Sequence, residues 1–509
     1  MLVLYFIFVL LATYWIFKRS NYSVKKAPGP KGLPIVGKGL EFNSQNLLKK
    51  LNELANEYGD FFVVNMFGID YLILNSEKVM REVIMDKHLK AFTNDRGPTF
   101  CGEYGHYGSQ GTAFYKEGYS HVHNTMRKYM VKGLHFYGED GIDMFENKIF
   151  SELGNLNEKM EKIRMRGDEA DMMALLQRSL SNVVSIALSG EVIPEGDEDE
   201  DMFWNFVDSN IYFMDNARSA VLMFLPLLRF LPGTYKRNWQ RLNDSKAKLI
   251  KHYFVAQKKT HIPGKPRGIC DVLFDAQEEE KAKGDVVLTD ERVICNIMET
   301  VIAGITTTWS ILSSTIFLLL HHPEFQDRLA KALQAITKQG EAVRSGDKAK
   351  SPLMEALELE THRLLLVTPM LLTRVSRKDV EYKGYTINEG TIIISNVWKL
   401  HHDETIWGDP WKFRPERFID QNGVLLPRDH QYRTSWMPFG IGKRACLAEP
   451  FARARYFLYV ATLLRNWSFC PPKDQPLRDY DPRHLENFDI ELTLRPKPYL
   501  CRIEKREWN

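Results

Sequence analysis

A segment near the C-terminal end of the chain has the residue types expected around a metal-bound sulfur. Residues 439–450 read FGIGKRACLAEP and contain one cysteine, Cys446. Gly440 and Gly442 let the backbone approach a flat partner closely, and Arg444 brings a fixed positive charge near anionic groups. A helix expected just beyond Cys446 points its positive end at a thiolate and favours that form. An isolated cysteine is more often a buried free thiol, but the surrounding pattern favours a metal ligand.

Two other groups of residues have a spacing that chemistry could use. Glu360 and Arg363 are three positions apart and share one helix face, where such a pair is ordinarily a weak ion pair. Residues 303–308 read AGITTT. A hydroxyl in this run can open the local hydrogen-bond ladder of a helix. The alternative is that these hydroxyls only bond back to the helix backbone.

These motifs, taken together, resemble those of the cytochrome P450 family. The cysteine segment matches the family pattern Phe-x-x-Gly-x-Arg-x-Cys-x-Gly at Phe439, Gly442, Arg444 and Cys446. Glu360 and Arg363, followed by Arg417, resemble the family's Glu-x-x-Arg motif and its later arginine. Residues 303–308 resemble its oxygen-binding groove. The resemblance covers nearly the whole chain, with the motifs in the family's order.

The resemblance implies a role for each matching residue. Cys446 would be the axial thiolate of haem b, and Arg444 would lie beside a haem propionate. Glu360, Arg363 and Arg417 would form a buried triad that supports the cysteine loop. Thr307 would deliver protons to bound dioxygen, with Thr306 beside it, and Gly304 would leave room above the haem. Arg374 resembles the position whose His or Arg binds a propionate. Arg127 is a weaker match to a further propionate contact, with His121 or His123 replacing the tryptophan common in relatives.

The chain departs from the family pattern at three positions. Ala448 stands where the family usually has glycine, which adds a methyl group and is expected to tighten packing. Pro450 is compatible with a helix only in its first turn, where a missing N–H costs no hydrogen bond. Thr306 stands where the family usually has a carboxylate, so the proton relay lacks its customary acid.

The implied function is that of a haem-thiolate monooxygenase. Such an enzyme uses O2 and two electrons from NADPH to hydroxylate or epoxidise a small lipophilic molecule, such as a steroid, a fatty acid or a xenobiotic. The electrons would come from a flavoprotein reductase, with cytochrome b5 as a second candidate donor. One alternative is a haem-thiolate isomerase or dehydratase that needs no O2; the change at Thr306 allows it and Thr307 argues against it. The other is a non-catalytic haem or lipid binder.

Composition limits the partners and the compartment. The 68 Lys and Arg residues nearly balance the 65 Asp and Glu residues, which gives no bulk charge of the kind that indicates nucleic acid. The six cysteines are scattered without a CxxC pair, which fits a reducing compartment.

The N-terminal stretch is expected to be a membrane anchor, residues 1–18. The apolar run Leu2–Phe17 is near the lower limit of the ~17–25 residues that span a bilayer. A cleaved signal peptide is the rival, but no basic stretch precedes the run and no small-x-small site follows it. Basic residues after the run predict a cytosolic body on the endoplasmic reticulum membrane. Residues 19–37, rich in Lys, Pro and Gly, would be a hinge, and residues 38–509 one catalytic domain.

The expected elements make the body mainly α with small β-sheets, as in the P450 fold. A long helix should open after Thr289 and end before Pro323. Its uncharged stretch, residues 301–320, could instead be a second membrane span, but its many Ser and Thr residues favour a buried helix. Strand signals lie at residues 61–67 and 71–74 around a turn, with Ser76 capping the next helix. Further strands are expected within 380–394, broken at Gly384 and Gly390, and along the alternating run 490–494.

Two surface features have a functional reading beside an ordinary one. The apolar, proline-broken segment 221–233 resembles the family's substrate lid near the membrane, but it could simply be core. A basic patch near the cysteine could dock an acidic reductase, although solvated surface charge explains such residues equally well. Its candidate members are Lys128, Lys443, Arg453 and Arg455.

Overall fold

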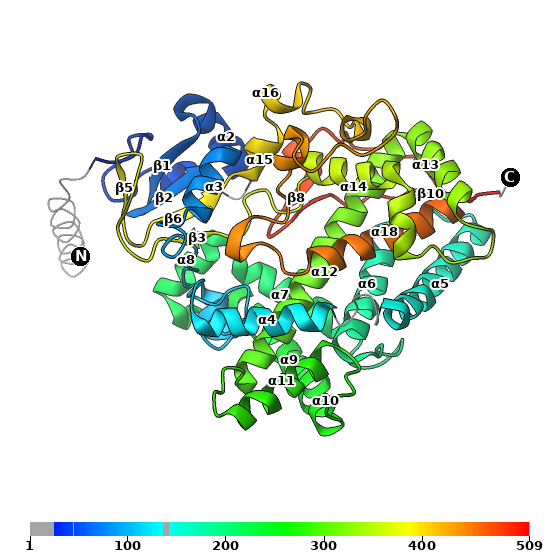
Figure 1. Ribbon diagram of the computed structural model, residues 1–509, viewed down its shortest axis with the longest axis horizontal. Coiled ribbons are helices and arrows are strands. Elements are labelled where there is room, and N and C mark those ends of the chain that lie inside the picture. The colour runs from blue at the N-terminus through cyan, green and yellow to red at the C-terminus, as the bar shows by residue number, and fades with distance from the viewer. Residues whose placement is uncertain (1–24, 44, 136–141, 508–509) are drawn as a thin grey trace.

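The long helix α12 (Asp290–His321) runs through the middle of the protein, and the other helices pack around it (Figure 1). The computed structural model describes residues 25–43, 45–135 and 142–507. Helix α12 begins directly after Thr289, as the sequence predicted, and the side chain of Thr289 caps it by accepting a hydrogen bond from the backbone N–H of Arg292. Within the described residues α12 alone is long and apolar enough to cross a membrane, yet 83% of its most apolar window is buried. It is therefore a core helix.

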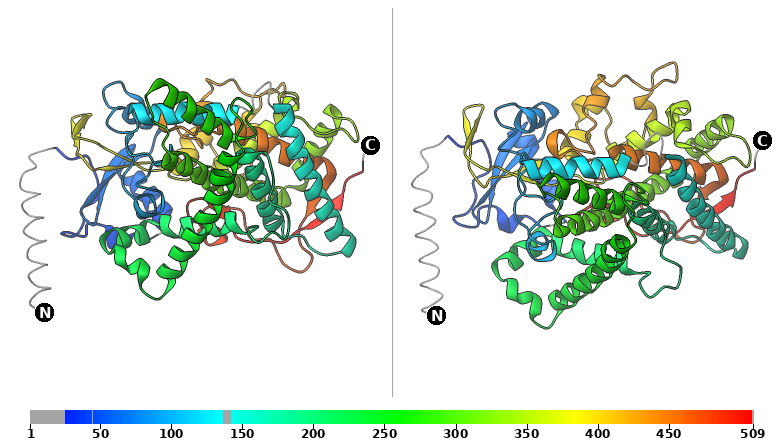
Figure 2. Two further views of the ribbon diagram at one scale, coloured as in Figure 1. Left: turned by 90° about the horizontal axis from the view of Figure 1, so that it is seen from below. Right: turned by 60° about the horizontal axis from the view of Figure 1, so that its bottom comes forward.

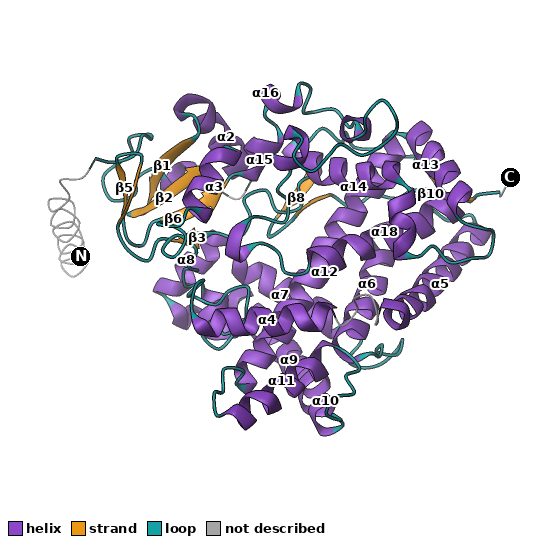
Figure 3. Ribbon diagram, in the orientation of Figure 1, coloured by secondary structure: helices purple, strands orange, loops and turns teal. Residues whose placement is uncertain are grey.

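Helices make up most of the body (Figure 3). The longer ones, in chain order, are α2 (Leu47–Tyr58), α3 (Glu77–Met85), α4 (His121–His135), α5 (Ile142–Arg166), α6 (Met172–Ser189), α7 (Met202–Met214), α8 (Asn216–Phe224), α9 (Thr234–Leu249), α11 (Ile269–Lys283), α12, α13 (Pro323–Ile336), α14 (Pro352–Leu364) and α18 (Glu449–Asn466). Short helices are α10 (Gln257–Lys259), α15 (Val397–His401), α16 (Glu404–Trp407) and α17 (Gln431–Thr434). Single turns include η3 (Pro226–Phe230), η6 (Pro415–Phe418) and η7 (Gly442–Arg444).

The largest sheet lies at one end of the molecule, away from most helices (Figures 1 and 2). Its strand order is β1 (Phe61–Met66), β2 (Ile69–Leu74), β6 (Ile392–Ser395) and β3 (Arg374–Val375). The predicted hairpin is correct. Phe67 and Gly68 both have positive φ, which closes a two-residue turn and starts β2 earlier than expected. Ser76 caps α3 as predicted.

The predicted strands within 380–394 are confirmed, with breaks at Gly384 and Gly390, whereas the run 490–494 folds differently from the expectation. Within 380–394, β4 (Val380–Tyr382) pairs with β5 (Tyr385–Ile387), whereas β6 runs parallel to β2. The run 490–494 is not one strand. It contains the turn of a hairpin formed by β8 (Phe488–Ile490) and β9 (Leu494–Pro496). The remaining strands, β7 (Trp467–Cys470) and β10 (Arg502–Lys505), pair with each other.

The described part of the predicted hinge, residues 25–37, lies along the edge of β1. Val63 donates its backbone N–H to the carbonyl of Pro28 at 2.8 Å, and a side chain at Gly29 would collide with the carbonyl of Val63. This segment is therefore held against the sheet over its described length. The predicted anchor, residues 1–18, and residues 19–24 lie outside the described residues.

Candidate active site

The loop before Cys446 is a closed turn that needs two glycines. The backbone N–H of Cys446 donates to the carbonyl of Phe439 at 2.8 Å. Gly440 and Gly442 have φ values of 70° and 71°, a region that side chains disfavour. A Cβ at Gly442 would also press on Ile84 at 3.2 Å. The glycines thus set the course of the chain toward the cysteine.

The helix that follows Cys446 begins where the sequence predicted. In α18 Pro450 occupies the first turn, where its missing N–H is harmless. Ala448 is the N-cap residue, with φ of −100°. Because this φ is negative, the position does not need glycine, and the departure from the family pattern costs no backbone strain.

The thiol of Cys446 lies deep in the protein but is still accessible. Burial raises the pKa of this thiol, whereas the backbone N–H of Ala448 and the charge of Arg127 oppose the rise. The side chain of Cys446 is nevertheless exposed. The sulfur is therefore open to a partner.

One face of α12 is open in the same way. The helix is buried along most of its length, but Ala303 is exposed, and Gly304 and Thr307 are half-buried. The hydroxyl of Thr307 donates to the carbonyl of Ala303 at 2.6 Å on this open face. Thr306 is buried instead, and its hydroxyl donates to the carbonyl of Ile302 at 2.7 Å.

The missing side chain of Gly304 makes room for a helix rather than only for a ligand. A Cβ at this position would lie 3.1 Å from Val184 of α6, which is tighter than an ordinary contact. Gly304 therefore allows α6 to pack closely on α12. The packing of α6 is therefore a second reason for a glycine at this position, beside the expected room for a ligand.

Three buried arginines gather between the cysteine loop, β3 and the segment before α4. Arg444 donates to the carbonyls of Asn94, Thr112 and Tyr115. Arg374 reaches only the side chain of Asn94 and the carbonyl of Ile441. Arg96, which no sequence motif indicated, donates to the carbonyls of Ala113, Leu372 and Thr373.

These guanidinium groups lack carboxylate partners at ion-pair distance in the described part of the chain. Burial lowers the pKa of Arg444 and of Arg374 to about 10, and for Arg374 the charge of Arg444 adds to the effect. Burial lowers the pKa of Arg96 well below its ordinary value, again with help from the other two. Such a concentration of buried positive charge is stable only with anionic partners.

Arg127 and His123, both on α4, complete this cluster. Arg127 donates to the carbonyl of Ala445 at 3.0 Å, so it contacts the residue directly before the cysteine. His123 is buried, and its Nδ1 atom has no hydrogen-bond partner among the residues that the structure describes. Burial together with the charge of Arg444 lowers its pKa to about 3. His121 instead points outward and pairs with Asp285. Of the two histidines considered in place of a tryptophan, His123 is the one that faces the arginines.

This set of residues fits haem b. The porphyrin carries two carboxylates, and the unpaired Arg96, Arg374 and Arg444 supply the positive charges that would neutralise them. The accessible thiol of Cys446 suits an iron ligand, and the unpartnered ring nitrogen of His123 is a further candidate donor to a carboxylate.

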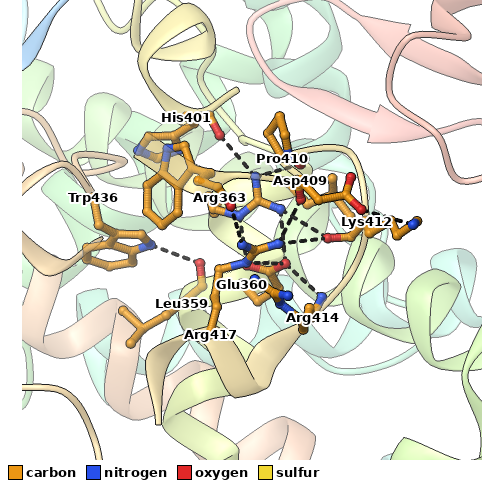
Figure 4. Close-up of polar contacts among 12 residues, drawn as sticks. Leu359, Glu360, Arg363, His401, Asp409, Pro410, Lys412, Arg414, Arg417 and Trp436 are labelled. Carbon is orange, nitrogen blue, oxygen red and sulfur yellow. Dashed lines mark hydrogen bonds and ion pairs between the residues drawn. The ribbon is translucent and has the colours of Figure 1, made fainter. Parts of the chain in front are cut away.

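The predicted triad is assembled in a fully buried position (Figure 4). The carboxylate of Glu360 accepts from Arg363 at 2.7 and 2.9 Å and from Arg417 at 3.1 Å. It also accepts from the backbone N–H of Arg414. The other guanidinium nitrogens donate to main-chain carbonyls, which include those of His401, Trp407, Asp409, Pro410 and Lys412. Two cations around one anion are thus satisfied almost completely by hydrogen bonds, as a buried charge requires.

Glu299 is a buried carboxyl group that the sequence analysis did not single out. It lies on α12, two turns before Thr307, and accepts from the backbone N–H groups of Ala113 and Phe114 at 2.8 and 3.2 Å. Burial raises its pKa to about 7, against the opposing effect of these bonds and of Arg444 and Arg96. The available signal was a single acid inside the apolar part of the helix, which is ambiguous without the fold.

Two of the four residues of the predicted basic patch do not contribute exposed positive charge. Arg453 is paired with Glu358 and Glu355 at 2.9 and 3.0 Å. Arg455 is buried against α12. Their helical spacing did not show that one faces carboxylates and the other faces the core. Lys128 stays exposed, and Lys443 is half-buried.

A surface hollow of about 600 Å³ lies next to Arg417 and Tyr432, with Glu416 and His430 also in its lining. It shares no residue with the cysteine loop or with the open face of α12. It therefore has no part in the arrangement around Cys446.

In the described part of the chain, an accessible cysteine thiol lies beside buried guanidinium groups that have no carboxylate at ion-pair distance, which is the arrangement expected of a haem-thiolate protein. Residues 27–502 match the family model described as Cytochrome P450, and the chain belongs to the cytochrome P450 family. Cytochrome P450 2D20 of Mesocricetus auratus is 28% identical over 496 residues, covering 96% of this chain and 94% of that protein. Cytochrome P450 2D14 of Bos taurus is 26% identical over 490 residues, covering 96% and 95%. The protein is accordingly a cytochrome P450 monooxygenase.

Proposed function

We propose that the protein uses O2 and NADPH-derived electrons to hydroxylate or epoxidise a small lipophilic substrate. The observation that carries this proposal is the pairing of two open groups in an otherwise buried interior, the thiol of Cys446 and the hydroxyl of Thr307. A ligand thiol alone would suit an isomerase or a binding protein as well. An accessible hydroxyl on α12, which packs against the helix that follows Cys446, adds the means to hold and move a proton.

Cys446 would hold haem b by its sulfur, and Arg374, Arg444 and Arg96 would bind its carboxylates, with Arg127 and His123 beside them. Haem b bound in this way supplies the iron at which dioxygen is reduced and one oxygen atom is inserted into the substrate. Phe439 and Gly442 act on this site through the backbone, because they close the turn that presents the cysteine. Glu360, Arg363 and Arg417 stabilise the fold behind it.

Thr307 would hold a proton on its Oγ1 atom, which lies between the carbonyl of Ala303 and the open side of α12. Thr306 is a weaker candidate for this task, because its hydroxyl is buried and bonded to Ile302. The missing acid at residue 306 leaves Thr307 dependent on water for its proton supply.

A lipophilic substrate is favoured by an apolar surface on the segment predicted to be a lid. Phe224 at the end of α8 is 85% exposed and Leu227 in η3 is 72% exposed. Val221, Leu225, Phe230 and Leu231 are also exposed. An exposed apolar patch of this kind suits contact with a bilayer. We propose that it rests on the endoplasmic reticulum membrane, with the body in the cytosol and residues 1–18 as the anchor.

We further propose that a NADPH-dependent flavoprotein reductase, with cytochrome b5 as a second donor, docks on the side of α4. Lys128 and Lys132 are exposed there, and Lys443 lies close to Arg127 and Arg444. Attraction between this basic surface and an acidic partner would weaken as salt screens it. Turnover should therefore fall with added salt faster than substrate binding does, and equal responses would count against the docking surface.

The test of the proposed function compares the wild type with Cys446→Ala. The reduced, carbon-monoxide-treated wild type should give a thiolate-type Soret band that the variant lacks. A survey of lipophilic compounds under ¹⁸O2 with NADPH and reductase should then yield a product that carries one labelled atom. Product formation without NADPH and O2 would favour the isomerase. Haem binding without NADPH consumption across the survey would favour a binding protein.

A further inference from the structure

Arg455 is a buried cation that none of the roles above uses. It lies on α18, nine residues after Cys446, and is 2% exposed. Its Nη2 atom donates to the carbonyl of Gly304 at 2.8 Å and to the hydroxyl of Thr308. The side chain therefore links the helix that follows the thiolate to the turn of α12 that carries Thr307.

Nothing in the described part of the chain balances the charge of Arg455. Its Nε and Nη1 atoms have no hydrogen-bond partner, and the ring of Phe451 lies 5.1 Å from the guanidinium. The one titratable group that acts on it is the hydroxyl of Tyr459, whose own pKa is raised by burial. Burial lowers the pKa of Arg455 to about 10, which leaves it protonated at neutral pH. An unpaired charge in a low-dielectric region acts strongly on its surroundings.

Arg453, one half-turn earlier on α18, shows the contrast. Its guanidinium is shared between Glu358 and Glu355, and the ring of Trp436 lies 5.4 Å away. Nearby carboxylates thus cancel its charge. The two arginines on one helix therefore differ in two respects: Arg455 contacts α12 and has no carboxylate at ion-pair distance in the described residues, whereas Arg453 is paired with carboxylates.

The open face of α12 lies directly beside the group that Arg455 contacts. Gly304 is half-buried on that face, and Thr307 follows it by three residues. The family usually has a carboxylate at position 306, but here Thr306 is neutral and its hydroxyl bonds to the carbonyl of Ile302. Glu299 is two helical turns away and bonds to Ala113 and Phe114. Arg455 is therefore a fixed charge that is hydrogen-bonded directly to this turn.

We propose that Arg455 is a positioning residue on the side of the site that α12 forms. It fixes the Gly304–Thr308 turn of α12, and its charge gives the face beside Thr307 a positive potential that favours anionic ligands. The inference depends on haem being bound through Cys446. It concerns a different property, namely which ligands the site prefers once haem is present.

The test compares an anionic with a neutral ligand of the ferric protein. Arg455→Gln keeps a donor for the carbonyl of Gly304 and removes the charge. We expect the dissociation constant of cyanide, which binds as an anion, to rise about tenfold relative to that of imidazole. The thiolate-type carbon monoxide spectrum of the variant should be retained, which separates this result from a failure of the haem site itself.

Two controls make the result specific to an uncompensated charge. Arg455→Lys retains the charge, and its cyanide-to-imidazole ratio should stay within about twofold of the wild type. Arg453→Gln removes an equal charge two residues away, and the ratio should not change. An unchanged ratio in Arg455→Gln, or equal weakening of both ligands, would overturn the proposal. If Arg455→Gln takes up no haem, Arg455→Lys decides, because a tenfold change with the charge retained contradicts the proposed role.

Discussion

The guanidinium of Arg127 lies 3.0 Å from the carbonyl oxygen of Ala445, so α4 is tied to the residue that precedes Cys446, the proposed haem ligand. The same charge favours the thiolate of Cys446. Arg127→Ala should therefore release haem to apomyoglobin about tenfold faster, the effect expected from losing a charged hydrogen bond. The thiolate signature should also be lost at a higher pH than in the wild type, because the pKa of the thiol rises without the arginine.

Lys128→Ala is the control for this prediction. Lys128 is the next residue of α4 and is exposed, with its ammonium group 5.6 Å from the ring of Tyr129. Its removal should leave the haem transfer rate unchanged. Equal rates for Arg127→Ala and the wild type would show that the bond to Ala445 has no part in holding the loop.

The buried triad predicts a large loss of stability on removing its anion. In Glu360→Gln the guanidinium groups of Arg363 and Arg417 would remain buried with no carboxylate between them. We expect a loss of about 3–5 kcal/mol in the free energy of unfolding, measured by urea titration of the haem-loaded protein. Arg328→Ala is the control, because Arg328 forms an exposed ion pair with Glu416. That change should cost at most about 1 kcal/mol. Similar losses in both variants would contradict a special role for the triad.

The sequence could predict the elements of the fold better than their pairing. Caps and turns are local, which is why Thr289, Ser76 and the turn at Gly68 were predicted correctly. The pairing of β6 with β2 joins residues more than 300 positions apart, and no local signal reports it. The strand assigned to residues 490–494 failed because a tight turn can have the same alternation of apolar residues as a strand.

Site residues that belong to a recognisable sequence motif could be predicted. Residues that differ from ordinary surface residues only in being buried could not. Cys446 and the triad stand in recognisable patterns. Arg96, Glu299 and Arg455 do not, since an arginine or a glutamate is ordinarily on the surface. Their importance follows from what covers them, which is a property of the fold.

Glu299 predicts a specific dependence of stability on pH. Its pKa is raised from 4.5 to about 7, so the folded protein holds the proton more tightly than the unfolded chain does. The associated stability is complete below pH 4.5 and is lost as the pH rises toward 7, by at most about 3 kcal/mol. Arg96 and Arg444 face this carboxylate and oppose the shift without reversing it. The urea midpoint of the wild type should therefore fall across this interval.

Glu299→Gln should remove that fall, because the amide keeps the bond to Ala113 and does not titrate. Glu53→Gln, at an exposed position of α2, should leave the pH profile as it is in the wild type. A profile for Glu299→Gln that still declines between pH 4.5 and 7 would assign the effect to other groups.

The apolar patch around α8 and η3 predicts which surface enters a bilayer. Phe224→Trp should give a fluorescent reporter that brominated lipids quench when the full chain is bound to vesicles. Val424→Trp is the matched control, since Val424 is also exposed but lies in the loop after η6. Quenching of the added tryptophan should be clear at residue 224 and absent at residue 424. Equal quenching at both would rule out the proposed orientation.

A comparison of Thr306 with Thr307 tests whether the Thr307 hydroxyl holds a proton, because the two side chains are identical and differ only in their position on α12. Both hydroxyls donate to a carbonyl four residues earlier, but Thr307 lies on the open face of α12 and Thr306 is buried. Thr307→Val keeps the shape and removes the hydroxyl, so product formed per NADPH consumed should fall severalfold while substrate affinity stays the same. Thr306→Val loses one internal bond and should change stability by about 1 kcal/mol, with the yield per NADPH preserved. If both variants lose yield equally, the hydroxyls act through helix structure, and Thr307 has no separate part in proton delivery.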